Sequence, residues 1–109
     1  MSYDEKIDRK MYTVVQSWDN IEKKNMFGGT CYMLNGNMFC GVHKEYMILR
    51  LGQDNADTAL RQAYVRPFDI TGKAMKGWVM VNPEGFIHNG ELREWIDMAK
   101  TFADTLPPK

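Results

Sequence analysis

The sequence predicts an α+β fold in which helices pack on one mostly antiparallel, five-stranded sheet and form two layers with it. Three observations lead to this fold class. Consecutive runs of β-forming residues are separated by short turns, as in hairpins. Amphipathic helical stripes lie near both ends of the chain. A weaker helical pattern separates three strands from two later ones, so the predicted order is α-β-β-β-α-β-β-α.

The first helix is predicted over residues 3–19, because apolar residues recur there at helical spacing. The stripe consists of Ile7, Met11, Val14, Val15, Trp18 and Ile21. The residues that follow are mostly polar and are predicted to break the helix before the sheet begins: Asn20, Lys23, Lys24 and Asn25.

Three consecutive strands are predicted over residues 30–34, 38–42 and 46–51, where β-forming residues are frequent. The first two strands are joined by Asn35-Gly36. This dipeptide is typical of a type I′ hairpin turn, because both central residues of that turn have positive φ.

A regular two-residue turn places Cys31 directly opposite Cys40. Because successive side chains of a strand point to opposite faces, each face of this hairpin then carries its own set of residues. One face holds Tyr32, Leu34 and Phe39, and the other holds Cys31, Met33, Met38, Cys40 and Val42.

The second half of the chain is predicted to add a short helix, two strands and a terminal helix. Ala56, Ala59, Leu60 and Ala63 have helical spacing and give a helix over residues 54–63. Strands are predicted over residues 68–70 and 77–81. The last helix has the cleanest apolar stripe and runs from Asn89 to Leu106.

Composition restricts the class of protein. The chain has 109 residues, which is the size of one domain, and we expect residues 1–109 to form that single domain. Its 14 basic and 14 acidic side chains balance, which argues against a general binder of nucleic acids or membrane surfaces. The start of the chain is not apolar enough for a secretory signal, and no apolar run is long enough for a membrane span. The predicted location is the cytoplasm.

The face with Cys31, Met33, Met38, Cys40 and Val42 is a candidate interaction face. Two helical stripes cover one face of the sheet well, so an apolar second face needs another cover. A partner protein or a second copy of the chain, as in a homodimer, would provide it. The alternative is that the short helix and the loops cover this face.

We find no pattern that indicates catalysis, a metal site or a cofactor, and we expect a protein that is not an enzyme. Cys31 and Cys40 are either a redox pair or two small buried thiols, the second being the usual state of free cysteines. Their spacing to His43 and His88 fits no zinc motif.

Arg50, Arg66, Lys73, Lys76 and Trp78 are the candidate binding residues. Two lysines in a glycine-bounded connection beside a tryptophan could hold an anion or a stacked base. The alternative for this segment is a solvated turn beside a core aromatic residue. A small ligand or a nucleic acid would bind here if the later strands pair beside the strand that carries Arg50.

Two blocks of the chain resemble the N-terminal domain of the TfoX/Sxy family, in its compact stand-alone branch. The first is Met26-Phe27-Gly28-Gly29 with Asn35-Gly36 and Met38-Phe39, and the second is residues 66–79, Arg-Pro-Phe-Asp-Ile-Thr-Gly-Lys-Ala-Met-Lys-Gly-Trp-Val. The terminal helix, with Trp95-Ile96 and the ending Leu106-Pro107-Pro108-Lys109, is similar as well.

The resemblance implies a bacterial cytoplasmic protein with a two-layer α+β domain. Full-length members of the family are regulators associated with natural competence and carry a second, C-terminal domain, which we do not expect in this chain. The family supplies no catalytic residues to carry over. We therefore expect a regulatory domain that acts through protein–protein contacts, with binding of a small ligand or a nucleic acid as the alternative.

Overall fold

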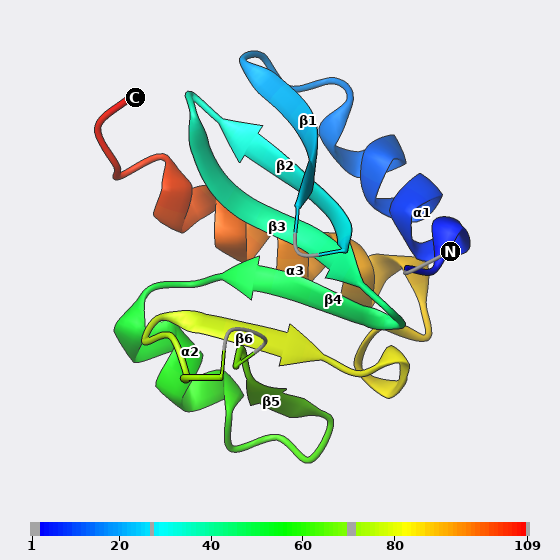
Figure 1. Cartoon of the computed structure of the whole chain (residues 1–109), viewed down its shortest axis with the longest axis vertical. Coiled ribbons are helices and arrows are strands. Elements are labelled where there is room, and N and C mark those ends of the chain that lie inside the picture. Colours follow the sequence, from blue (N-terminus) through cyan, green and yellow to red (C-terminus); the bar gives the residue numbers. More distant parts are fainter. Residues whose placement is uncertain (1–2, 27, 70–71, 109) are drawn as a thin grey trace.

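The computed structural model describes residues 3–26, 28–69 and 72–108. It contains one antiparallel sheet of six strands and three α-helices (Figure 1). In chain order the elements are α1 (Glu5–Val15), β1 (Ile21–Met26), β2 (Gly29–Leu34), β3 (Asn37–His43), β4 (Tyr46–Arg50), α2 (Gln53–Ala59), β5 (Val65–Pro67), β6 (Trp78–Val81), the 3₁₀ turn η1 (Pro83–Phe86) and α3 (Asn89–Ala103). The strands lie side by side as β1-β2-β3-β4-β6-β5. The predicted α+β class is confirmed, but the predicted number of strands is wrong.

Strand β1 is the element that the prediction missed. Its sequence, Ile-Glu-Lys-Lys-Asn-Met, is polar because the strand is at the edge of the sheet and pairs with β2 alone. Charged side chains on an edge strand are common, since they stay in water and discourage pairing with other chains. A polar run of this kind carries little of the apolar alternation by which strands are recognised.

Strand β5 lies earlier than predicted, at Val65–Pro67 instead of residues 68–70. Phe68 and Asp69 follow the strand, and Ile70 lies outside the described residues. Pro67 ends β5, which is the other edge strand, and an edge tolerates a residue without a backbone N–H.

The helices are shorter than predicted but lie where expected. In α1, the Asp4 side chain caps the first turn, because its Oδ1 accepts hydrogen bonds from the backbone N–H of Lys6 at 2.8 Å and of Ile7 at 3.4 Å. The helix ends at Val15, so Trp18 and Ile21 continue the apolar pattern beyond it. Helix α2 ends at Ala59, and α3 ends at Ala103.

The β2–β3 hairpin has the predicted turn but a different register. Asn35 and Gly36 have φ of 53° and 83°, as a type I′ turn requires. Met33 pairs with Met38, but Tyr32 pairs with Cys40, so Phe39 is an extra residue that forms a β-bulge. Cys31 lies opposite Gly41 instead of Cys40, and the predicted pairing of the two cysteines is wrong.

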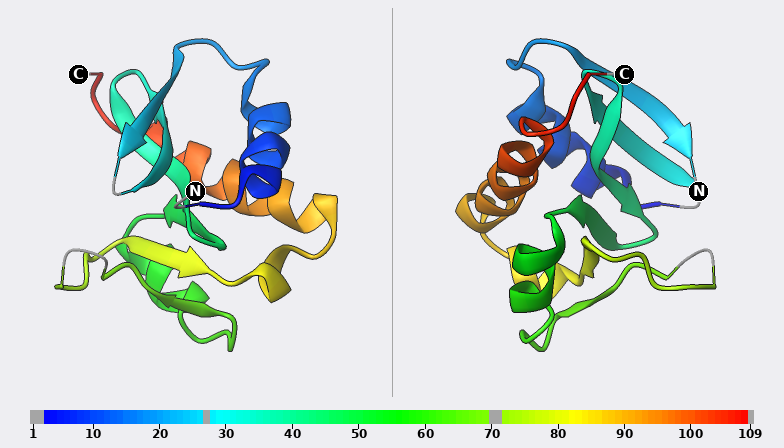
Figure 2. Two further views of the ribbon diagram at one scale, coloured as in Figure 1. Left: turned by 45° about the vertical axis from the view of Figure 1, so that its right-hand side comes forward. Right: turned by 90° about the vertical axis from the view of Figure 1, so that its left-hand side faces the viewer.

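The sheet has one face with helices and one without. The larger core cluster combines strand residues such as Phe39, Leu49 and Val79 with residues of all three helices. We call this side the helix-covered face. The smaller cluster, on the helix-free face, has no helical member among the described residues: Cys31, Met38, Ile48, Phe68 and Met80. Figure 2 shows α1 and α3 together on one side of the sheet.

Strands β2 and β3 approach each other closely at two glycines. A Cβ on Gly29 would lie 2.0 Å from the Val42 carbonyl oxygen, and a Cβ on Gly41 would lie 2.5 Å from the Thr30 carbonyl oxygen. Both distances are far below a van der Waals contact, so only glycine fits. Figure 2 shows that the sheet is curled, with strand β1 at one edge leaning away from α1 and α3.

We predict that Gly29→Ala lowers the free energy of unfolding by at least about 2 kcal/mol, because backbone atoms cannot move aside as a flexible side chain can. Gly90→Ala is the control. Gly90 lies in α3, and a methyl group at this position would have nothing within 4 Å. Alanine there should therefore raise the free energy of unfolding by about 0.5–1 kcal/mol. Urea unfolding followed by circular dichroism measures both changes, and a Gly29→Ala protein of unchanged stability would contradict the close contact.

Candidate functional site

The order β4-β6-β5 brings three of the predicted binding residues onto neighbouring strands. Arg50 pairs with Trp78 across β4 and β6, and Arg66 pairs with Met80 across β5 and β6. Directly opposed residues share a face of the sheet, and Trp78 and Met80 lie on the helix-free face. The sequence predicts that these residues converge only if the later strands pair beside the strand that carries Arg50. The structure shows this pairing.

Arg50 lies close to two aromatic rings. Its guanidinium carbon is 5.4 Å from the centroid of the Trp78 ring and 5.6 Å from that of the Phe102 ring, which belongs to α3. Cation–π contacts of this kind contribute about 0.5–2 kcal/mol, depending on how far the cation is shielded from water. The rings hold the guanidinium in place while the side chain stays partly exposed.

Arg66 makes the matching contact on the far side of β6. Its guanidinium carbon lies 5.2 Å from the centroid of the Tyr46 ring, and Arg66 is exposed while Tyr46 is partly buried. We call Tyr46, Arg50, Arg66, Trp78 and Phe102 the cation–aromatic surface. Ile48 and Met80 lie between the two arginines and are buried.

The two predicted lysines lie beside this surface rather than within it. Lys73 and Lys76 are exposed in the connection from β5 to β6, whose described residues 72–77 lie on the side of the sheet away from α1 and α3 (Figure 2). Phe68, at the start of this connection, packs against Trp78 with 5.5 Å between ring centroids. The connection is thereby tied to the sheet at its beginning.

None of these four cations is paired with a carboxylate in the part of the chain that the structure describes. The ion pairs found there are Lys23–Asp8, Arg93–Asp97 and Lys100–Asp104. The cation–aromatic surface therefore presents positive charge that the described residues leave without an opposite charge.

The predicted interaction face is divided between the two sides of the sheet. Cys31, Met33 and Met38 belong to the helix-free face, but Cys40 and Val42 pack on the helix-covered face, because the bulge at Phe39 shifts the alternation of side chains by one position. All except Met33 are buried. The predicted homodimer and its interaction face remain a prediction, and in this conformation Met33 alone of these five side chains is partly exposed.

The two thiols lie in different core clusters and are both free. Burial raises the pKa of Cys31 to about 11. Burial also raises the pKa of Cys40 well above its usual range, and the nearby Cys31 and Asp8 act in the same direction. A thiol that keeps its proton is a poor nucleophile and a poor metal ligand, so this pattern favours the structural role over the redox role.

A buried polar cluster beneath α1 was not predicted. Asp8 is nearly buried, and its Oδ1 accepts a hydrogen bond of 2.5 Å from the Tyr32 hydroxyl. Lys23 of β1 donates to the other carboxylate oxygen at 2.7 Å. Burial and the hydrogen bond to Asp8 raise the pKa of Tyr32 above its usual range. The cluster joins α1 to β1 and β2.

The sequence holds a weak sign of this cluster. Asp8 precedes Met11 by three positions and Val15 by seven, so it stands on the apolar stripe of its helix rather than on the polar face. A charged residue in such a position needs a buried partner. Its partners, Tyr32 and Lys23, are far away in the sequence and could not be identified from it.

Neither a metal site nor a membrane span is found among the described residues. They contain no group of three or more histidine, cysteine, aspartate or glutamate residues that could hold a metal ion. No helix among them combines the length and the apolar character that crossing a membrane requires.

We predict that Tyr32→Phe destabilises the fold by about 1.5–3 kcal/mol, because it removes a hydrogen bond to a buried carboxylate. Tyr12→Phe is the control, since Tyr12 is half exposed and should change stability by less than about 0.5 kcal/mol. Urea unfolding of both variants and of an Asp8→Asn, Tyr32→Phe double-mutant cycle tests the pair. Additive effects of the two substitutions would show that Asp8 and Tyr32 do not interact.

We also predict a loss of stability at alkaline pH. The pKa of Cys31 rises from 9.0 to about 11 on folding, so between these values the unfolded chain releases a proton that the folded chain keeps. The stabilisation is complete below pH 9.0 and falls by up to about 1.4 kcal/mol per pH unit as the pH rises toward 11. The free energy of unfolding, measured across this pH range, should decline less steeply for Cys31→Ala than for the original chain. An equally steep decline in both proteins would assign the effect to other groups.

Comparison with known proteins identifies a family for most of the chain. No match was found among curated proteins or among solved structures. The family model described as TfoX N-terminal domain matches residues 13–103, a span that includes all six strands, α2 and α3. The resemblance seen in the two sequence blocks is therefore confirmed, and the chain belongs to the TfoX N-terminal domain family.

Proposed function

We propose that the chain is a non-enzymatic regulatory domain that binds an acidic segment of a partner protein on its cation–aromatic surface. The observation that carries the proposal is the position of Arg50. Its guanidinium lies within cation–π distance of the rings of both Trp78 and Phe102, and the residue is partly exposed, with no carboxylate partner in the described residues. An ordered arginine of this kind loses little conformational entropy when it binds a carboxylate.

The neighbouring residues favour a partner with both acidic and apolar side chains. Arg66 offers a second cation, and the partly exposed rings of Tyr46 and Trp78 offer apolar contact beside it. Arginine, tyrosine and tryptophan are the residue types that contribute most to protein–protein interfaces. Lys73 and Lys76, exposed next to this surface, would increase the rate of association with an acidic partner.

A protein partner is favoured over a nucleic acid for two reasons. Trp78 contacts both Phe68 and Arg50, and Tyr46 contacts Arg66, so these rings are already engaged with neighbours and are poor platforms for stacked bases. The chain also has no net charge, and nonspecific binding of nucleic acids depends on a basic excess.

The family supports the regulatory part of the proposal. The TfoX N-terminal domain belongs to proteins associated with competence regulation, and a competence-regulator-like role in the bacterial cytoplasm is consistent with a domain that acts by binding. A protein that works through such contacts needs no catalytic group, which agrees with the lack of a catalytic motif in the sequence.

We predict that the variant Arg50→Gln, Arg66→Gln binds an acidic partner at least about tenfold more weakly, since each lost charge-assisted contact contributes about 1 kcal/mol or more. The probe is a short fluorescent peptide rich in glutamate and leucine, followed by anisotropy. A second probe of single-stranded DNA, measured in the same buffer, identifies the class of partner.

The matched control is Arg9→Gln, Arg61→Gln, which removes the same charge from two exposed arginines outside the surface. Equal loss of peptide binding in both double variants would mean that net charge and not this surface is responsible. Binding of the DNA alone, abolished by Arg50→Gln, Arg66→Gln, would replace the protein partner with a nucleic acid.

A further inference from the structure

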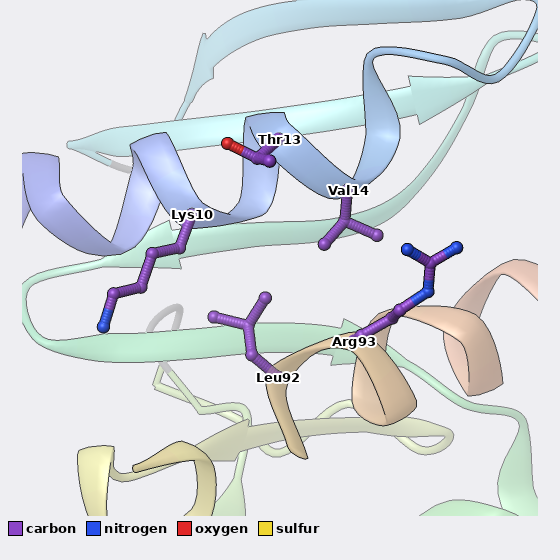
Figure 3. A pocket seen from close by; sticks show the side chains of 5 residues that line it. All are labelled: Lys10, Thr13, Val14, Leu92 and Arg93. Atoms are coloured by element: carbon purple, nitrogen blue, oxygen red, sulfur yellow. The ribbon is translucent and has the colours of Figure 1, made fainter. Parts of the chain in front are cut away.

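A second candidate site lies between α1 and α3, on the helix-covered side of the molecule. The cavity has a volume of about 260 Å³ and is lined by Lys10, Thr13 and Val14 of α1 and by Leu92 and Arg93 of α3. Figure 3 shows the lining side chains, which come from both helices. None of its lining residues belongs to the cation–aromatic surface, so its role does not depend on the function proposed above.

The centre of this cavity is apolar. Leu92 is buried in the main core, and Val14 packs against the same cluster. In Figure 3 these two side chains point toward each other from opposite helices, Val14 from α1 and Leu92 from α3. Val14 is only partly buried and supplies most of the apolar surface that a ligand would remove from water, because Leu92 is already almost fully buried.

Two cations flank the apolar centre. Figure 3 shows the Lys10 ammonium group and the Arg93 guanidinium on opposite sides of Val14 and Leu92. No lining residue is acidic. Arg93 forms an exposed ion pair with Asp97 at 3.7 Å, a separation at which the pair is weak and the guanidinium can bind another anion.

Thr13 adds one polar group at the edge. Its hydroxyl donates a hydrogen bond of 2.9 Å to the Arg9 carbonyl oxygen, so its oxygen remains an acceptor only. The donors that face a ligand are therefore the charged groups of Lys10 and Arg93. Together they select for an anion over a neutral or cationic molecule of the same shape.

We propose that this cavity binds a small carboxylate with a short apolar body, such as a medium-chain fatty acid. The apolar body lies over Val14 and Leu92, and the carboxylate is bound by Arg93 or Lys10. The volume is slightly below the roughly 300–1,000 Å³ typical of ligand pockets, which limits the ligand to a small molecule. Because the ligand touches both helices, its binding would stabilise the docking of α1 on α3.

The test is a titration of the whole chain with sodium octanoate, followed by the backbone amide resonances of ¹⁵N-labelled protein. We expect saturable shifts confined to α1 and the first half of α3. Because either cation can bind the carboxylate, the double variant Lys10→Gln, Arg93→Gln should weaken binding at least about threefold, as expected for loss of an exposed charge-assisted contact. Octylamine, which has the opposite charge, should bind at least about tenfold more weakly.

Two matched variants control for net charge: Lys6→Gln, also on α1, and Arg61→Gln, outside both helices. Neither residue lines the cavity, and neither substitution should change octanoate binding. The proposal is wrong if octanoate does not bind, if it shifts resonances of residues elsewhere, or if the control variants weaken binding as much as the double variant Lys10→Gln, Arg93→Gln does.

Discussion

The close approach of β2 and β3 is the constraint on which the rest of the structure depends. At Gly29 and Gly41 the two backbones are too near for any side chain, and the bulge at Phe39 adds a local bend. The sheet therefore curls, with β1 leaning away from α1 and α3 (Figure 2). This curvature lets one chain bury residues on both faces of a single sheet without a second layer of helices.

The curl also decides which surfaces remain for binding. The cluster of Cys31, Met38, Ile48, Phe68 and Met80 is buried on the concave face, so it contributes stability and not a docking surface. The arginines at either side of this cluster stay at least partly exposed, and each is fixed by a ring. Positive charge therefore surrounds an apolar cluster that the chain's own side chains already fill. A partner would gain little binding free energy by inserting a side chain into it.

The sequence was most informative where local patterns are strong. The Asn35-Gly36 turn, the three central strands and the terminal helix follow from turn chemistry and periodicity within a few residues. The sequence predicts that Arg50 and Trp78 meet only if the later strands pair beside β4. It does not predict that pairing itself, because strand order depends on contacts between distant residues.

The features that the sequence did not reveal have long-range causes. Nothing near Phe39 in the chain marks it as a bulge, so the register was predicted as regular and the two cysteines were placed on one face. Strand β1 is an edge strand with a polar sequence, and Asp8 finds its partners on two other elements. In each case the deciding interaction joins segments that only the folded chain brings together.

The two borders of the sheet limit how copies of this domain can meet. On one side, β1 exposes Glu22, Lys23 and Lys24, and on the other, β5 is only three residues long and ends in Pro67. Charged and proline-terminated borders resist the addition of a further strand from another molecule. Copies of this chain would then associate through side-chain surfaces rather than through backbone pairing. Such contacts are reversible, and continued addition of strands into a cross-β fibre is disfavoured.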